Sequence, residues 1–236
     1  MPLRVLIACE ESQTVCLAFR RLGHEAYSCD LNPETGGHPE WHILGDCLPL
    51  LDGHCRFRTS DGAEHSVPGA WDLLIAHPPC TYMSNAGACR MYPRKGEIDP
   101  DRLALAQEAK AFFLRFLEAD SPHICVENPR PLKIVGLPEK TQQIQPYEYG
   151  EPWSKLTCLW LKGLPRLVPT NLVEDHKPYV SCGTSRNKGK KDKAGFSRAG
   201  GASRVRSRTF PGIAEAMATQ WSEYICKASS DPSGAV

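Results

Sequence analysis

A strand-like segment and a helical pattern open the chain. Residues 3–8 are mostly apolar and predict a strand, and residues 11–22 repeat apolar side chains at helical spacing before Gly23. Residues 25–30 predict a second strand that ends in Asp30. A strand, a helix and a second strand in this order predict a βαβ unit with parallel strands. The pattern therefore favours an α/β fold.

Two later apolar runs stop abruptly at proline. The run at 71–77 is followed by Pro78-Pro79-Cys80, and the run at 123–126 by Glu127-Asn128-Pro129. Residues 101–119 between them form the clearest amphipathic helix pattern of the chain. Because open α/β sheets bind ligands beyond the carboxyl ends of their strands, we expect Cys80 and Glu127 to meet there. A thiol and a carboxylate at one site can serve as nucleophile and as acid or base.

The remaining pattern completes the sheet. Two Asp-Gly pairs predict a hairpin within 49–70, residues 142–161 alternate as further strands do, and residues 211–226 are typical of a last helix with proline in its first turn. The predicted fold class is α/β, with a doubly wound and mostly parallel sheet.

Composition sets limits on the size, the compartment and the metal content of the protein. A chain of 236 residues suffices for one well-packed domain, and its apolar runs are too short to cross a bilayer. We expect a cytoplasmic protein with neither a signal peptide nor a membrane partner. The 11 cysteines are odd in number and scattered, which predicts free thiols in a reducing compartment. Histidine and cysteine show no paired ligand spacing, so we expect no metal.

Charge is unevenly distributed, although the net charge is only +1. Residues 183–208 hold nine basic side chains and one acidic side chain, a net charge of +8. Glycine and serine between them are typical of a loop. Such a segment favours contact with a polyanion such as nucleic acid, and a solvated insertion is the alternative.

Taken in order, the Pro78-Pro79-Cys80 and Glu127-Asn128 segments resemble those of the cytosine-C5 DNA methyltransferases, especially short bacteriophage and prophage forms. The resemblance covers nearly the whole chain and implies the Rossmann-like methyltransferase type of sheet. It implies that Cys80 adds to carbon 6 of a flipped-out cytosine, that Glu127 contacts N3 and the exocyclic amine, and that Asn128 holds the loop. The implied substrate is double- or single-stranded DNA.

The resemblance also implies S-adenosylmethionine as the methyl donor. Family members usually have a glycine-rich turn after the first strand, whereas this chain has Cys9-Glu10-Glu11-Ser12, and a modified donor stays open as an alternative. Ser12 would cap the following helix and Glu10 would meet the methionine ammonium. Asp30 would bind ribose hydroxyls, and Asp46 the adenine amine. The implied donor-binding residues are Cys9, Glu10, Ser12, Asp30, Asp46 and Pro78.

Two departures from the family concern the target base. Thr81 stands where members commonly have glutamine, and the region 143–147 lacks the arginine that contacts cytosine O2. Arg130, Lys155, Arg204 and Arg206 are the alternatives for that contact, beside Pro79 and Thr81 as further substrate-binding residues.

Domain boundaries follow from the same resemblance. We expect a catalytic core at 1–162, a reduced target-recognition and basic loop at 163–207, a helix at 208–226 that packs back on the core, and a disordered tail at 227–236. The short recognition segment implies relaxed sequence specificity.

Three rival functions remain open. The substrate could be free cytosine nucleotide or RNA, since the recognition segment is small. Amino-methyltransferases carry an Asp/Asn/Ser-Pro-Pro-aromatic loop, from which His77-Pro78-Pro79-Cys80 departs at its first and last positions. The glycine-free turn also fits a non-catalytic DNA-binding protein on a methyltransferase scaffold.

Overall fold

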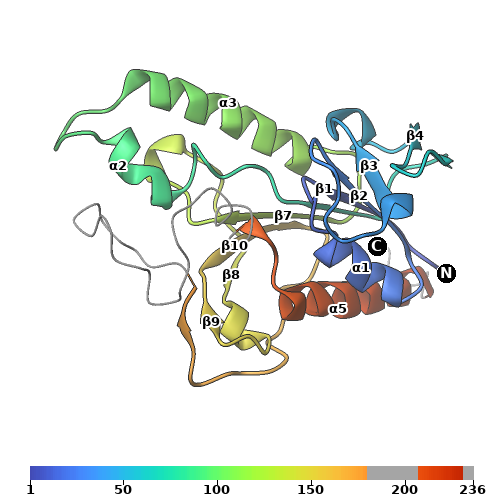
Figure 1. The fold of residues 1–236 in the computed structure, drawn as a ribbon. Coiled ribbons are helices and arrows are strands. Elements are labelled where there is room, and N and C mark those ends of the chain that lie inside the picture. Colours follow the sequence, from blue (N-terminus) through green and yellow to red (C-terminus); the bar gives the residue numbers. More distant parts are fainter. Residues whose placement is uncertain (180–206, 231–236) are drawn as a thin grey trace, which may run out of the picture.

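A seven-stranded sheet forms the centre of the protein, in a computed structural model that describes residues 1–179 and 207–230. Its strand order is β3-β2-β1-β6-β7-β10-β8 (Figure 1). The first five strands in that order are parallel to one another, and β10 is antiparallel to both of its neighbours. The strands are β1 (Arg4–Ala8), β2 (Glu25–Asp30), β3 (His42–Leu44), β6 (Leu73–Ala76), β7 (Ile124–Pro129), β8 (Gln142–Ile144) and β10 (Thr157–Lys162).

Helices cover both faces of this sheet (Figure 1). They are α1 (Thr14–Arg21), α2 (Ala88–Met91), α3 (Pro100–Leu117) and α5 (Pro211–Ser230). Two small sheets lie outside the centre, formed by the hairpin of β4 (Cys55–Arg58) with β5 (Glu64–Val67) and by β9 (Trp153–Ser154) with β11 (Lys177–Pro178). Short 3-10 turns occur at 39–41, 48–50, 85–87, 133–135 and 146–148.

Alternate residues of the central strands face two separate cores. Leu6, Leu74 and Val126 pack on the α3 side, whereas Ile7 and Ile75 pack on the side of α1 and α5. Strands that are buried on both faces read as continuous apolar runs, which is why β1, β6 and β7 were visible in the sequence. The predicted α/β fold with a doubly wound, mostly parallel sheet is confirmed.

The ends of two helices differ from the prediction. The first helix begins at Thr14 rather than at residue 11, because Cys9 and Gln13 take positive φ values of 59° and 58° and form a loop. The last helix continues to Ser230, so the expected tail from residue 227 is wrong for its first four residues, where Lys227 and Ala228 are good helix formers. Residues 231–236 and the basic segment up to residue 206 lie outside the described residues.

The described residues bear on disulfides, membrane-spanning helices and metal sites. All ten cysteines in the described ranges are free thiols. None of the described helices combines the length and apolar character needed to cross a membrane. Within the same ranges, no group of three or more His, Cys, Asp or Glu side chains is arranged to hold a metal ion.

Close packing fixes the start of α5 against the turn that precedes β9. A Cβ on Gly212 would overlap the backbone carbonyl oxygen of Tyr149, and the Gly212 N–H donates to Glu151 at 3.3 Å. We therefore expect Gly212→Ala to lower the free energy of unfolding by about 1–3 kcal/mol, as overpacking does. Gly69→Ala is the matched control, because its Cβ would lie 3.6 Å from the nearest atom, in ordinary contact. Equal urea midpoints for the two variants would contradict this packing.

Candidate active site

Three polar side chains lie on adjacent strands where the parallel sheet ends. Glu10 follows β1, His77 follows β6, and Glu127 lies within β7. The register pairs Ala76 with both Ala8 and Val126, so His77 is the next residue between β1 and β7, and its N–H donates to the Ala8 carbonyl at 2.9 Å. The site therefore lies at the carboxyl edge predicted from the sequence.

The loop that carries Cys80 is tied to β7. Asn128 is buried, and its side-chain amide donates to the Pro78 carbonyl at 2.9 Å. Within the loop, the Ser84 N–H donates to the Cys80 carbonyl at 2.9 Å, which closes a helical turn after Cys80. Pro78 and Pro79 restrict the approach to that turn. Asn128 thus fixes the segment that positions the thiol.

The thiol of Cys80 is held in a half-buried setting. Burial raises its pKa above the ordinary value, and the negative charge of Glu127 raises it further. The charge of Lys155 and a hydrogen bond with Ser84 lower the pKa of Cys80, but the pKa stays above its ordinary value. Cys80 is therefore a protonated thiol at neutral pH, and the charge of Glu127 reaches it within the same site.

Glu127 is an anion in spite of its burial. Burial raises the pKa of its carboxyl, but the hydrogen bond and charge of His77, together with Lys155, outweigh burial and hold the pKa below the usual range. The His77 Nδ1 and a Glu127 carboxylate oxygen lie 3.3 Å apart. The side chains of His77 and Glu127 are only 9% and 13% exposed, so solvent screens this pair weakly.

Glu10 caps the first helix. Its two carboxylate oxygens accept from the N–H groups of Val15 and Cys16, at 2.7 and 3.1 Å. The predicted cap, Ser12, accepts only a longer bond from the Thr14 N–H, at 3.4 Å. The helix begins after a left-handed residue, which brings Glu10 rather than Ser12 under its first free N–H groups. Burial raises the pKa of Glu10. The charge of His77 and the two N–H bonds lower it, but the effect of burial is larger.

The other expected donor-binding residues lie at the carboxyl ends of β1, β2, β3 and β6, with Asp30 the last residue of β2. Cys9 lies with its sulfur 4.0 Å from that of Cys47. One oxygen of Asp30 accepts from the Asn32 N–H at 2.8 Å, and one oxygen of Asp46 accepts from the Leu48 N–H at 3.0 Å. Among the described residues, the second oxygen of each of these two carboxylates accepts no hydrogen bond. Such oxygens suit the hydroxyl and amine groups of a nucleoside.

Of the two basic candidates for the base that the structure describes, Lys155 lies at the site and Arg130 does not. Lys155 lines a narrow recess with Glu127, Thr157, Thr209, Phe210 and Ile213, and its Nζ lies 5.6 Å from the centre of the Phe210 ring. Arg130 is exposed and its charge acts instead on Cys158, which packs on the α3 side of the sheet. Arg204 and Arg206 lie outside the described residues.

The two remaining substrate-binding candidates, Pro79 and Thr81, are exposed on the loop beside Cys80. The Thr81 carbonyl accepts from the Arg102 guanidinium at 2.5 Å, and that guanidinium also lies over the Tyr82 ring at 4.4 Å. The first turns of α3 therefore support the loop from the outer side.

The segment before α5 approaches the first loop of the chain. Arg208 donates to the Thr35 hydroxyl at 2.8 Å and lies 3.9 Å from a Glu11 carboxylate oxygen. Lys155 donates to the Arg208 carbonyl at 3.5 Å. This segment consequently connects the loop after β1 with the recess beside Glu127.

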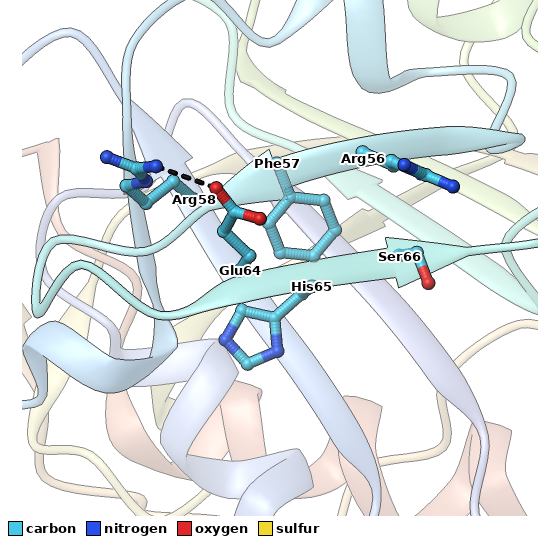
Figure 2. A pocket seen from close by; sticks show the side chains of 6 residues that line it. All are labelled: Arg56, Phe57, Arg58, Glu64, His65 and Ser66. Carbon is cyan, nitrogen blue, oxygen red and sulfur yellow. Dashed lines mark hydrogen bonds and ion pairs between the residues drawn. The ribbon is translucent and has the colours of Figure 1, made fainter.

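A second hollow lies on the β4–β5 hairpin, away from these residues. Figure 2 shows its lining and the 2.7 Å bond between Arg58 and Glu64. His65 lies between the hydroxyls of Tyr27 and Thr59, both at 3.1 Å. Arg58 and Glu64 are paired with each other, and His65 is held by two residues outside the lining. The lining of the hollow is Arg56, Phe57, Arg58, Glu64, His65 and Ser66.

His77 is the site residue that sequence reasoning missed. In the sequence, His77 stands out only as the first residue of the His77-Pro78-Pro79-Cys80 segment. Its signal is a titratable side chain directly after an apolar strand and directly before two prolines.

Matches to known proteins are confined to solved structures. No family model matches the sequence, and no curated protein matches it. The chain is similar to a solved structure described as a candidate DNA modification methyltransferase encoded within a prophage of E. coli, with 14% sequence identity and a TM-score of 0.39. The match covers 67% of this chain and 46% of that one, so it spans less than half of the prophage protein's structure.

Proposed function

We propose that this protein is a DNA cytosine-C5 methyltransferase with Cys80 as its nucleophile. The observation that carries the proposal is the arrangement of Cys80, Glu127 and Asn128 at the carboxyl ends of β6 and β7. Asn128 holds the Cys80 loop, and the charge of Glu127 reaches the Cys80 sulfur. A thiol with a buried carboxylate at this position has the groups that addition to a pyrimidine ring requires.

The reaction proceeds by temporary addition of sulfur to the ring. The Cys80 thiol would release its proton to solvent, and its sulfur would bond to carbon 6 while electron density moves to carbon 5. Carbon 5 would then bond to the methyl carbon of the sulfonium donor as the sulfur–methyl bond breaks, and the donor would leave as a neutral thioether. A base removes the proton from carbon 5, the sulfur–carbon 6 bond breaks, and the Cys80 thiolate leaves.

Glu127 supplies the charge that this addition needs. As an anion at neutral pH, it accepts hydrogen bonds from the exocyclic amine and from a protonated N3. Protonation at N3 makes carbon 6 more electrophilic, so a fixed anion beside N3 favours attack by sulfur. Lys155 lines the same recess and is our candidate for the contact with cytosine O2.

The donor that fits this site is S-adenosylmethionine or a modified form of it, which supplies an electrophilic carbon on a sulfonium. Asp30 and Asp46 would hold its ribose and adenine groups, because each has a carboxylate oxygen available to accept a hydrogen bond. Cys9, Ser12 and Pro78 would line the remaining wall. Since both oxygens of Glu10 already serve α1, Glu10 would act on a ligand ammonium mainly through its charge.

DNA is the proposed partner, and the target cytosine must leave the base stack to reach a half-buried thiol. The basic residues at 183–208 would bind phosphates, which makes binding strongly dependent on salt. In this proposal, residues 1–162 form the catalytic core, residues 163–207 recognise the target, and the helix at 208–226 packs back on the core.

Nucleoside mass spectrometry tests the proposed function. Purified protein is incubated with S-adenosylmethionine and, in parallel, with duplex DNA, single-stranded DNA, RNA and free cytidine triphosphate. We expect 5-methylcytosine in a DNA arm. A methyl group on N4 of cytosine or N6 of adenine would contradict the proposal, as would modification confined to RNA or nucleotide. Failure to bind the donor in calorimetry, together with retained DNA binding, would instead favour a non-catalytic protein.

A further inference from the structure

His77 occupies the middle position of the active-site edge. It lies between the strand that leads to Glu10 and the strand that holds Glu127, and its backbone N–H is bound to Ala8. The residue before a proline is restricted to extended backbone, so Pro78 further limits His77. This side chain is therefore held rigidly beside Glu127.

The contact between His77 and Glu127 uses one nitrogen of the ring. Nδ1 faces the Glu127 carboxylate at 3.3 Å, whereas Nε2 is buried and has no hydrogen-bond partner within the described residues. An uncompensated charge in a buried position is strongly unfavourable. His77 thus provides a hydrogen-bonding partner for an anion that is buried near Cys80.

Three charged or titratable groups approach this pair from neighbouring loops and turns. Glu10 approaches from the loop after β1, Lys155 from the turn between β9 and β10, and Cys80 from the loop that His77 itself precedes. The segment entering α5 contributes Thr209 and Phe210, which are uncharged, to the recess. Within this group of side chains, the His77 Nδ1 lies at hydrogen-bond distance from Glu127, at 3.3 Å.

We propose that His77 is the positioning residue of this site, holding one carboxylate oxygen of Glu127 through Nδ1 so that the other oxygen can bind the cytosine ring. This inference rests on the proposed function, because the role it assigns to Glu127 is contact with cytosine. His77 itself does not touch the base. It determines the orientation and the ionisation of the carboxylate that does.

Two amide substitutions separate the roles of the two ring nitrogens. In His77→Asn the side-chain N–H₂ can occupy the Nδ1 position and still donate to Glu127. In His77→Gln the amide extends to the Nε2 position and leaves Glu127 without its partner. The two variants bury the same functional group and differ by one methylene, so each controls for the other in thermal unfolding.

The readout is exchange of the C5 hydrogen of cytosine in DNA with solvent, measured without donor on tritiated duplex. Exchange requires addition of Cys80 to carbon 6, and it therefore reports the base side of the site alone. We expect His77→Asn to retain exchange within about tenfold of wild type and His77→Gln to lose about 10²-fold, as a misplaced group does. In a Glu127→Gln background, His77→Gln should cause no further loss.

The pH profile adds a second readout that a purely structural residue would not change. His77 lowers the pKa of Glu127, so removing the imidazole raises it. The acid limb of exchange should therefore move to higher pH in His77→Asn. This measurement remains decisive even where His77→Gln does not fold.

Equal exchange rates and equal acid limbs in wild type and both variants would overturn the role of His77 while leaving the proposed function intact. Rescue by glutamine but not by asparagine would also overturn it, because it would assign the role to Nε2. No exchange by wild-type protein that binds the duplex would overturn the proposed function, and this inference with it.

Discussion

Cys80→Ala should abolish methyl transfer to DNA, with a loss of at least about 10⁴-fold in the single-turnover rate. The reason is that carbon 5 of cytosine becomes nucleophilic only after sulfur adds to carbon 6. Alanine fills less space than cysteine in a half-buried loop, so the fold and DNA binding should persist. Transfer of labelled methyl groups to duplex DNA measures the effect.

Cys89→Ala is the matched control for this prediction. Cys89 lies in α2, a few residues beyond Cys80, and is exposed. Its loss should leave the rate within about twofold of wild type, since surface substitutions rarely disturb a site. Comparable losses in the two variants, or full activity in Cys80→Ala, would contradict the assignment of the nucleophile.

Glu127→Gln should change two properties of the protein in opposite directions. Methyl transfer should fall by about 10²- to 10⁴-fold, because the neutral amide cannot stabilise a protonated ring as a carboxylate does. Alkylation of Cys80 by iodoacetamide at pH 8 should become about three- to tenfold faster. The negative charge of Glu127 raises the pKa of the Cys80 thiol, so its removal lowers that pKa and increases the thiolate fraction.

Peptide mass spectrometry of the alkylated protein measures both thiols in one sample. Cys89 should react at the same rate in wild type and Glu127→Gln, and it thereby controls for reagent and pH. Slower alkylation of Cys80 in the variant would show that the Glu127 charge does not act on the sulfur as described.

Much of the fold could be predicted from the sequence, for a physical reason. Strands β1, β6 and β7 are buried on both faces and therefore appear as uninterrupted apolar runs. The start of α1 was harder to place, because nothing in the residue types at 9 and 13 demands a positive φ. The end of α5 lies at Ser230 and not at the predicted residue 226, since the helix continues through residues of ordinary helix propensity.

The location of the candidate site followed from the sequence, but its internal contacts did not. Asn128 and the Cys80 loop meet because β6 and β7 are adjacent parallel strands that end at the same edge of the sheet. The pairing of His77 with Glu127 depends on the register of β6 against β7, which one sequence does not reveal. The choice of Lys155 among the basic candidates likewise depends on how the turn between β9 and β10 folds beside α5.

Duplex DNA with 5-fluorocytosine at candidate target positions tests the central claim most directly. Fluorine cannot leave carbon 5 as a proton does, so an enzyme that adds through Cys80 stalls after transfer while still bonded to the base. With S-adenosylmethionine, wild-type protein should give a species on denaturing gels whose mass equals protein plus DNA plus the transferred group, and Cys80→Ala should give none. Absence of this adduct from wild-type protein that binds both the DNA and the donor would contradict covalent C5 catalysis.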